Sequence, residues 1–420
     1  MNPLTLLRNA GALLCWTALA APVLAANIRG ELTLKDNQTQ FRSGEPIRLR
    51  LNIEADTSGY SVMNSPTDLP HAHLDKVVVT PTQGVYPWSA DQERFDDYRN
   101  DLFGFTELIP GKPFKLAIRL NNYFRFDSPG RYTVHITTRR VRAVDPSSHD
   151  PRRFDSPPVE VTSNDVSFEV LPMSPDDEAR LAASLERRIR DATDAGTAQA
   201  IIVNDLEDLT GDAATAVKLS LYLKPQIIHG MTTNAATGLW IARNRGMVVS
   251  ALERAIVDPD QISTVNMDLL DTLVSLKSSM ARPYDPTQPE ASDDEDQLST
   301  EYVHQIAGTI PQRKGEPGID AARVVFDWMA RHDKASGPDF EGAREYLIAH
   351  FADVDPYNVD WLLNDHGKYL RDRRMVAVLQ HLVDDSHDPM FQPTRDAALK
   401  QLAAIAPEDA RVKGSRVPQE

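Results

Sequence analysis

The chain has 420 residues, of which 41% are apolar and 25% are charged, and its formal net charge is −16. This length allows more than one domain with its own core, and so acidic a chain repels phosphate backbones, which disfavours nucleic acid as a partner. Cys15 is the only cysteine, so no disulfide can form within the chain and a cysteine-based site is excluded after residue 15.

Residues 1–25 have the features of a secretory signal peptide. A short alanine-rich apolar run follows Arg8, and small residues precede the expected cleavage site, which is after Ala25 or, as second choice, after Ala26. The run is shorter than the roughly 20 apolar residues of a transmembrane helix, although an uncleaved anchor is the alternative. The sequence therefore predicts a periplasmic or secreted protein with no stable membrane insertion after cleavage.

The spacing of apolar residues changes at Pro172. Before it, residues 166–170 alternate with the period of two that is typical of a strand, and after it Leu181, Leu185 and Ile189 recur at helical spacing. We therefore expect a multidomain protein, β then α. Its predicted parts are an antiparallel β-sandwich over 27–172, an all-α, solenoid-like domain over 173–412 and a tail over 413–420.

The net charge is concentrated in the second part. Residues 27–172 carry 18 basic and 20 acidic side chains, whereas residues 173–420 carry 26 and 41. An acidic surface of this kind favours solubility, and an acidic docking face is the alternative interpretation.

Short strands separated by glycine and proline are predicted for the first part, at 30–34, 47–53, 77–79, 114–120, 124–136 and 166–170. The runs FRSGEPIRLRLNI (41–53) and FRFDSPGRYTVHI (124–136) resemble bacterial extracytoplasmic immunoglobulin-like domains. The resemblance implies a structural or adhesive sandwich and brings no catalytic residue with it. The segments 54–76 and 83–110 are expected to be long connections between strands.

These connections contain candidate binding residues. His71 and His73 are half of a metal site, to which Asp68 or Asp75 can add a carboxylate, although histidines in a polar loop are more often solvated. Trp88 and Tyr98 belong to an aromatic segment that either binds sugar or peptide or holds the loop against its own domain. The basic run at 139–142 is expected to lie on a solvated strand edge that discourages strand pairing. The alternative is that it meets the acidic helical part or a partner carboxylate.

The second part begins with a strong helix start at Ser174, Pro175 and two acids. Helices of about 10 to 20 residues follow. Two stretches, 251–273 and 378–402, contain a helix, an Asp-Pro turn and a second helix rich in leucine and alanine, and they resemble HEAT or armadillo repeats. Such repeats stack and present an extended concave surface, and an irregular helical domain is the alternative.

The helices are separated by segments of distinct composition. The predicted helices are 175–194, 197–209, 211–224, 234–243, 246–257, 262–281, 300–309, 318–333, 339–351, 356–370, 372–385 and 393–406. Between two of them, residues 282–299 combine proline with a run of acids, which predicts a flexible, exposed loop. The loop lacks the ligand spacing of an EF-hand, so calcium binding is not expected.

No phosphate-binding loop, zinc-protease motif or serine-hydrolase motif occurs in the chain. Adjacent acids such as Glu207-Asp208 are expected by chance on an acidic helical surface. The low-charge stretch 222–245 contains His229, Trp240 and Arg243, and it is interpreted as a buried contact between the two parts. The alternative is a pocket in which His229 acts as a general base.

These observations predict an exported, non-enzymatic scaffold that binds a protein or peptide in the cell envelope and uses no cofactor. The helical part is expected to carry recognition, with the β part as its structural or adhesive partner. The alternative is a hydrolase of envelope polymers with its pocket where the two parts meet.

Overall fold

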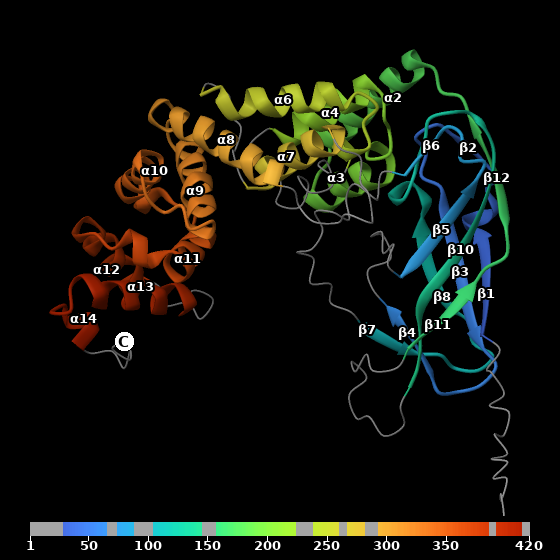
Figure 1. The fold of residues 1–420 in the computed structure, drawn as a ribbon, viewed down its shortest axis with the longest axis horizontal. Coiled ribbons are helices and arrows are strands. Elements are labelled where there is room, and N and C mark those ends of the chain that lie inside the picture. Colours follow the sequence, from blue (N-terminus) through green and yellow to red (C-terminus); the bar gives the residue numbers. More distant parts are fainter. Residues whose placement is uncertain are drawn as a thin grey trace, which may run out of the picture.

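The computed structural model describes residues 28–64, 74–87, 104–144, 157–223, 238–259, 267–281, 293–385 and 392–413. In these ranges a β-rich N-terminal region with antiparallel sheets precedes an all-helical C-terminal region (Figure 1). The last strand ends at Leu171 and the first helix begins at Pro175. The predicted order, β then α, is therefore confirmed.

Within the described ranges, the strands form two larger sheets and a small two-stranded one. In chain order they are β1 (Ile28–Leu34), β2 (Gln40–Arg42), β3 (Arg48–Ala55), β4 (Tyr60–Asn64), β5 (Asp75–Thr80), β6 (Val85–Tyr86), β7 (Gly104–Glu107), β8 (Phe114–Arg119), β9 (Arg125–Phe126), β10 (Gly130–Ala143), β11 (Pro158–Thr162) and β12 (Val166–Leu171). The first sheet has the order β1-β3-β8. The second is built on β2-β12-β10-β4-β7, with β5 and β11 also paired to β10, and β6 pairs with β9. The pairing of β2 with β12 is parallel, and the other pairs of named strands are antiparallel.

Alternation along the strands places one set of side chains in a shared core. On β3, Leu49, Leu51 and Ile53 are buried, and the residues between them are more exposed. They belong to the same buried cluster as Val134 and Ile136 of β10, which is in the other sheet. Apolar faces of both larger sheets therefore meet in one core.

The expected long connections contain further strands. Segment 54–76 includes β4, and segment 83–110 includes β6 and β7. These strands are short and were missed because their formation depends on partners far along the chain, β10 for β4 and β9 for β6.

The expected basic edge at residues 139–142 is also wrong. The strand β10 has partners on both sides, and Arg140 is only 2% exposed. Its Nη2 donates a hydrogen bond to Oδ2 of Asp75 at 2.6 Å, and Thr138 donates to the other carboxylate oxygen. Asp75, considered above as a metal ligand, therefore neutralises a buried arginine.

The helical region contains α2 (Pro175–Arg190), α3 (Ala195–Ile201), α4 (Asp212–Tyr222), α6 (Arg245–Val257), α7 (Met267–Ala281), α8 (Asp293–Thr309), α9 (Glu316–Arg331), α10 (Pro338–Ala349), α11 (Pro356–Asp365), α12 (Val376–Asp385), α13 (Gln392–Ile405) and α14 (Ala410–Lys413). The predicted start of α2 is confirmed, because Oγ of Ser174 accepts a hydrogen bond from N–H of Asp177 at 3.1 Å. A π-helical turn, Ile202–Leu206, follows α3.

The predicted acidic loop 282–299 ends earlier than expected. Residues 282–292 lie outside the described ranges, but α8 already begins at Asp293. Acidic side chains in a first helical turn interact favourably with the positive end of the helix dipole. One of them, Glu295, also accepts a hydrogen bond from Oγ of Ser278 on α7 at 2.6 Å. The acid run is thus part of a helix start.

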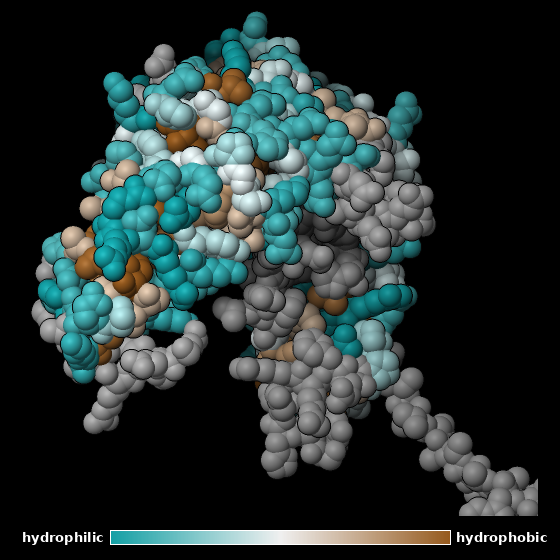
Figure 2. Space-filling model, turned by 60° about the vertical axis from the view of Figure 1, so that its left-hand side comes forward, coloured by the Kyte–Doolittle hydropathy of each residue, from teal (hydrophilic) through white to brown (hydrophobic). Residues whose placement is uncertain are grey.

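The helices form a bent array that leads away from the β region, from α2 beside it to α14 at the far end (Figure 1). One buried cluster joins α2, α3 and α4, and a second extends from α4 to the C-terminal helices. The face shown in Figure 2 is mostly hydrophilic, with apolar residues in small separate groups. Within the described ranges, no helix has the length and apolar character needed to cross a membrane.

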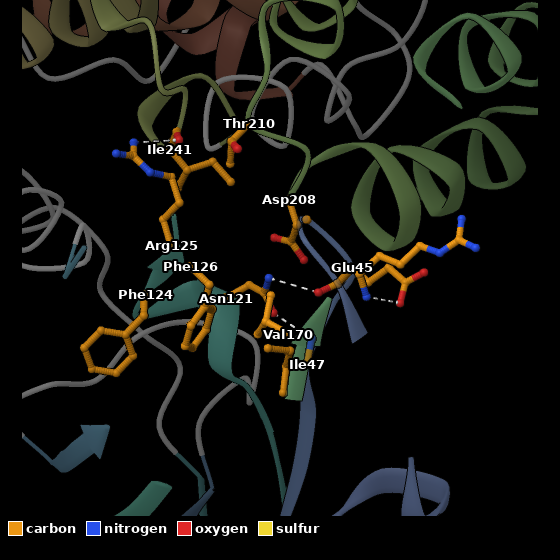
Figure 3. Close-up of a pocket in the computed structure, with 12 residues that line it drawn as sticks. Glu45, Ile47, Asn121, Phe124, Arg125, Phe126, Val170, Asp208, Thr210 and Ile241 are labelled. Atoms are coloured by element: carbon orange, nitrogen blue, oxygen red, sulfur yellow. Dashed lines mark hydrogen bonds between the residues drawn. The ribbon is translucent and has the colours of Figure 1, made fainter. Parts of the chain in front are cut away.

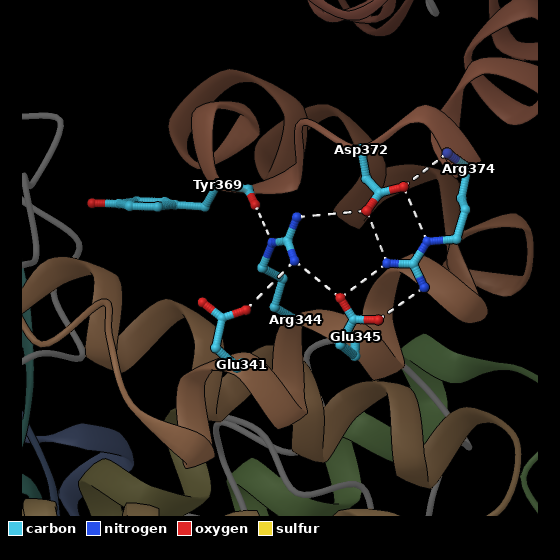
Figure 4. A network of polar contacts seen from close by, with 6 residues as sticks. All are labelled: Glu341, Arg344, Glu345, Tyr369, Asp372 and Arg374. Carbon is cyan, nitrogen blue, oxygen red and sulfur yellow. Dashed lines mark hydrogen bonds and ion pairs between the residues drawn. The ribbon is translucent and has the colours of Figure 1, made fainter.

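A network of charged side chains ties α10 to the segment before α12 (Figure 4). Arg344 donates from Nε to the carbonyl of Tyr369 at 2.6 Å, and Arg374 donates to both carboxylate oxygens of Glu345. Hydrogen bonds from Arg374 lower the pKa of Asp372. Several of these side chains are exposed, and ion pairs between exposed side chains contribute little to stability. The network therefore mainly fixes the positions of these surface side chains.

Candidate functional site

A buried cluster of charges joins the two regions. Arg119, the last residue of β8, donates from Nε and Nη2 to Oδ2 of Asp208 at 3.0 and 2.7 Å, and from Nη1 to Oε2 of Glu207 at 3.0 Å. All three side chains are below a tenth exposed. The expectation that Glu207 and Asp208 lie on the surface is therefore wrong, because Arg119 is their buried counter-charge.

Lys218 of α4 binds the backbone of the segment that contains Glu207 and Asp208. Its side chain is fully buried, and Nζ donates to the carbonyls of Glu207, Leu209 and Gly238 at 3.1, 2.6 and 2.6 Å. The three donors of the ammonium group are thereby used. The loop that follows the π-helical turn is thus held by Arg119 through its carboxylates and by Lys218 through its backbone.

Burial sets the protonation of this cluster. It raises the pKa of Glu207 to about 7, against the opposing effect of Arg119. It also raises the pKa of Asp208 and lowers the pKa of Lys218 to about 8. No local sequence pattern predicts this cluster, since Arg119 and the two acids come from segments nearly 90 positions apart.

The rest of the contact between the regions is polar and aromatic. Arg125 of β9 donates from Nη1 to the carbonyls of Ile241 and Ala242, both at 3.0 Å. Its guanidinium and that of Arg245 lie 4.7 and 5.1 Å from the ring centroid of Tyr86. Such cation–π contacts add to the hydrogen bonds that fix the orientation of the two regions.

The space left at this contact is small. A cavity of ≈ 10 Å³ lies between Asp208 and Thr210 on the helical side and Asn121, Phe124 and Phe126 on the β side (Figure 3). A volume of this size holds about one water molecule. This cavity therefore has no room for a polymer substrate.

The predicted site residues fall into two groups. Trp240 is buried in the core of the helical region, and Arg243 donates to Oγ of Ser43 at 3.2 Å and lies 3.4 Å from Oδ1 of Asp127. Both belong to the stretch interpreted as a contact between the parts, and its described residues do make that contact. The remaining candidates lie outside the described residues. They are His71, His73, Trp88, Tyr98 and His229.

A second hollow, which the sequence did not suggest, lies on the helical region away from this contact. Its volume is ≈ 420 Å³, within the range of ligand sites. We call it the α6–α8 groove. It is lined by Ser250, Glu253, Arg254 and Val257 of α6, by Lys277 of α7, and by Leu298, Glu301, Tyr302 and Gln305 of α8.

The walls of this groove are two helix faces. The lining residues of α6 and those of α8 both have the spacing i, i+3, i+4, i+7, which places each set on one side of its helix. Residues with that spacing usually face a core, yet six of these eight are polar, and four of the six are exposed. A polar stripe on two neighbouring helices is the signal that points to this groove.

Three polar side chains form its floor. Lys277 donates from Nζ to Oε1 of Glu253 and to the hydroxyl of Tyr302, both at 2.7 Å, and Tyr302 donates to the same Glu253 oxygen at 2.6 Å. Burial raises the pKa of Tyr302 to about 12, so its hydroxyl stays protonated. A protonated phenol and a paired lysine are suited to binding, and neither is activated as a nucleophile.

Among the described residues, no group of three or more histidine, cysteine or acidic side chains is arranged to hold a metal ion. Comparison of this chain with protein-family models, with curated proteins and with solved structures finds no match.

Proposed function

We propose that this protein is an exported, non-enzymatic scaffold that binds a protein or peptide of the cell envelope through its helical region. The observation that carries the proposal is the α6–α8 groove, a hollow that spans three successive helices and has both charged and apolar walls. The leader at residues 1–25 supports export.

The arrangement of the helices supports a solenoid-like architecture. In the described ranges, many helices contact the next helix or the one after it, as in α6 with α7 and α8, and α8 with α9 and α10. Stacking in one dimension is typical of repeat proteins, which use their extended surfaces for binding. The β region, whose two larger sheets share one core, supports the sandwich.

The buried contact between the regions supports a structural role for the β region. Arg119 and Arg125 both donate into the helical region. A contact built from buried ion pairs and directed hydrogen bonds holds one orientation, so the sandwich presents the helical groove at a fixed angle.

The alternative, a hydrolase with its pocket between the regions, has less support. The cavity there holds about one water molecule, and Trp240 and Arg243 are engaged in core packing and in contacts with the β region.

Site-specific photo-crosslinking tests the proposal. A photoreactive residue at Val257, in the groove, is compared in cells with the same residue at Val144, an equally exposed valine of the β region. We expect a crosslinked partner from Val257 alone, and binding of that purified partner to the mature chain. Equal crosslinking at both positions, or no crosslinking with a folded, exported chain, contradicts the proposal.

A further inference from the structure

Three sets of contacts fix the relative direction of the helices that line the α6–α8 groove. At one end, Arg245 of α6 donates to Oγ of Ser279 on α7 at 3.3 Å, and the adjacent Ser278 donates to Glu295 of α8. In the middle, Lys277 joins Glu253 of α6 to Tyr302 of α8.

At the other end, Arg313, which follows α8, donates from Nη2 to the carbonyl of Ala255 near the end of α6 at 3.4 Å. The starts of α6 and α8 are therefore at one end of the groove and their ends at the other. The two walls run in the same direction, and α7 runs against them.

This direction places the two apolar wall residues at opposite ends. Glu253 and Tyr302 lie at the same level, since they share a hydrogen bond. Leu298 is one turn before that level on α8, and Val257 is one turn after it on α6. Eight residues of helix rise by about 12 Å, so the apolar positions are about 12 Å apart along the groove.

The centre of the groove has unused hydrogen-bonding capacity of both kinds. Arg254 uses Nε on the carbonyl of Ser250, and among the described residues its two Nη groups have no partner. Glu253 accepts both of its hydrogen bonds on Oε1, which leaves Oε2 for a ligand. A ligand group that carries both hydrogen-bond donors and acceptors can therefore pair with Arg254 and Glu253 together.

An extended peptide has those properties. Its backbone N–H and C=O groups are unpaired, whereas a helix satisfies its own. Strand residues rise by about 3.3 Å each, and residues i and i+4 point to the same side about 13 Å apart. That spacing is close to the offset of about 12 Å along the groove between Leu298 and Val257.

We infer that the α6–α8 groove binds an extended peptide segment with two apolar side chains four residues apart, a specificity that rests on the proposed function. The apolar side chains contact Leu298 and Val257, and the backbone between them pairs with Arg254 and Glu253. A helical ligand would instead need apolar residues seven apart to cover a similar distance.

Selection from a random linear dodecapeptide library on the purified mature chain tests this inference. We expect enrichment of peptides with apolar residues at i and i+4, and fluorescence anisotropy with synthetic copies should show about tenfold weaker binding to Val257→Asp and several-fold weaker binding to Arg254→Ala. Both positions are exposed, so these variants should keep the circular dichroism spectrum of the parent. Val144→Asp is the matched control and should bind like the parent.

The other outcomes separate the inference from the proposed function. Enrichment of peptides whose apolar residues are seven apart, and which become helical when bound, contradicts the inference that the bound peptide is extended. Some peptides could bind Val257→Asp and Arg254→Ala as tightly as they bind the parent. Such peptides occupy another surface, and this result overturns the inference but agrees with the proposed scaffold function. No enrichment by a folded chain counts against both.

Discussion

Nη2 of Arg119, in the β region, lies 2.7 Å from Oδ2 of Asp208, in the helical region, and the two side chains are 6% and 4% exposed. The ion pair is thus withdrawn from water and connects segments 89 residues apart. A buried charge that loses its partner is strongly unfavourable. The relative orientation of the two regions therefore depends on this contact.

Replacement of Arg119 by alanine should destabilise the protein strongly. Asp208 and Glu207 would keep their burial but lose the guanidinium that compensates their charge, which costs about 3–5 kcal/mol. Urea denaturation of the mature chain measures the change in the free energy of unfolding.

The control for this variant is Arg139→Ala. Arg139 is 59% exposed and pairs with the equally exposed Glu160, and such surface pairs contribute less than about 1 kcal/mol. Equal losses for Arg119→Ala and Arg139→Ala would show that the buried pair has no special role.

Glu207 should make stability depend on pH near neutrality. Burial raises its pKa from 4.5 to about 7, so the folded state holds a proton that the unfolded state releases in this interval. The stability contribution is complete below pH 4.5 and is lost as the pH rises through 7. A shift of this size corresponds to roughly 3 kcal/mol.

Lys218 adds a dependence of opposite sign at higher pH. Its pKa is lowered from 10.5 to about 8, so the unfolded state binds more protons between these values and its contribution rises with pH there. Together the two groups contribute least to stability at about pH 7–8.

The free energy of unfolding, measured by denaturation at pH 5 and 7.5, should differ less between the two pH values in Glu207→Gln than in the parent. An equal difference in the two proteins would contradict the assignment of this pH dependence to Glu207.

Gly44 should tolerate alanine less well than Gly59. Both have a positive φ, 86° and 95°, so both pay a similar conformational cost of about 1–2 kcal/mol. A Cβ at Gly44 would lie 2.9 Å from Leu209 Cδ2 in the helical region, whereas a Cβ at Gly59 meets nothing within 4 Å. The loss in Gly44→Ala beyond that in Gly59→Ala measures the contact between the regions, and equal unfolding free energies for the two variants would argue against it.

The start of α2 should depend on the hydroxyl of Ser174. This side chain caps the first helix of the helical region, and removal of such a cap costs about 1 kcal/mol. Thermal unfolding of Ser174→Ala measures the loss. Ser250→Ala, at an exposed position within α6, is the control and should change stability little, since only the backbone carbonyl of Ser250 is used by Arg254.

Local pattern predicted much of the fold. The strand β3 and the start of α2 are where alternation and capping place them. The strands β4 and β7 were missed because each is short and is stabilised by a partner far away in the sequence. The start of α8 was missed because an acid run is typical of a loop, whereas here Ser278 and the helix dipole accommodate it.

The contact between the regions was predicted in part. The low-charge stretch that contains Trp240 and Arg243 was expected to be a buried contact, and the carbonyls of Ile241 and Ala242 do receive Arg125. The charged centre of the same contact was not expected. Glu207 and Asp208 are ordinary surface acids by sequence, and in the fold Arg119 supplies hydrogen bonds and a counter-charge to both.

The sequence by itself determined the change from strands to helices at Pro172 and the unequal distribution of charge, because each depends on neighbouring residues and on composition. The tertiary structure alone decided which charges are buried and which helix faces border a groove. Burial of a charge requires a partner, and the partners of Asp208 and Glu253 come from other strands and helices.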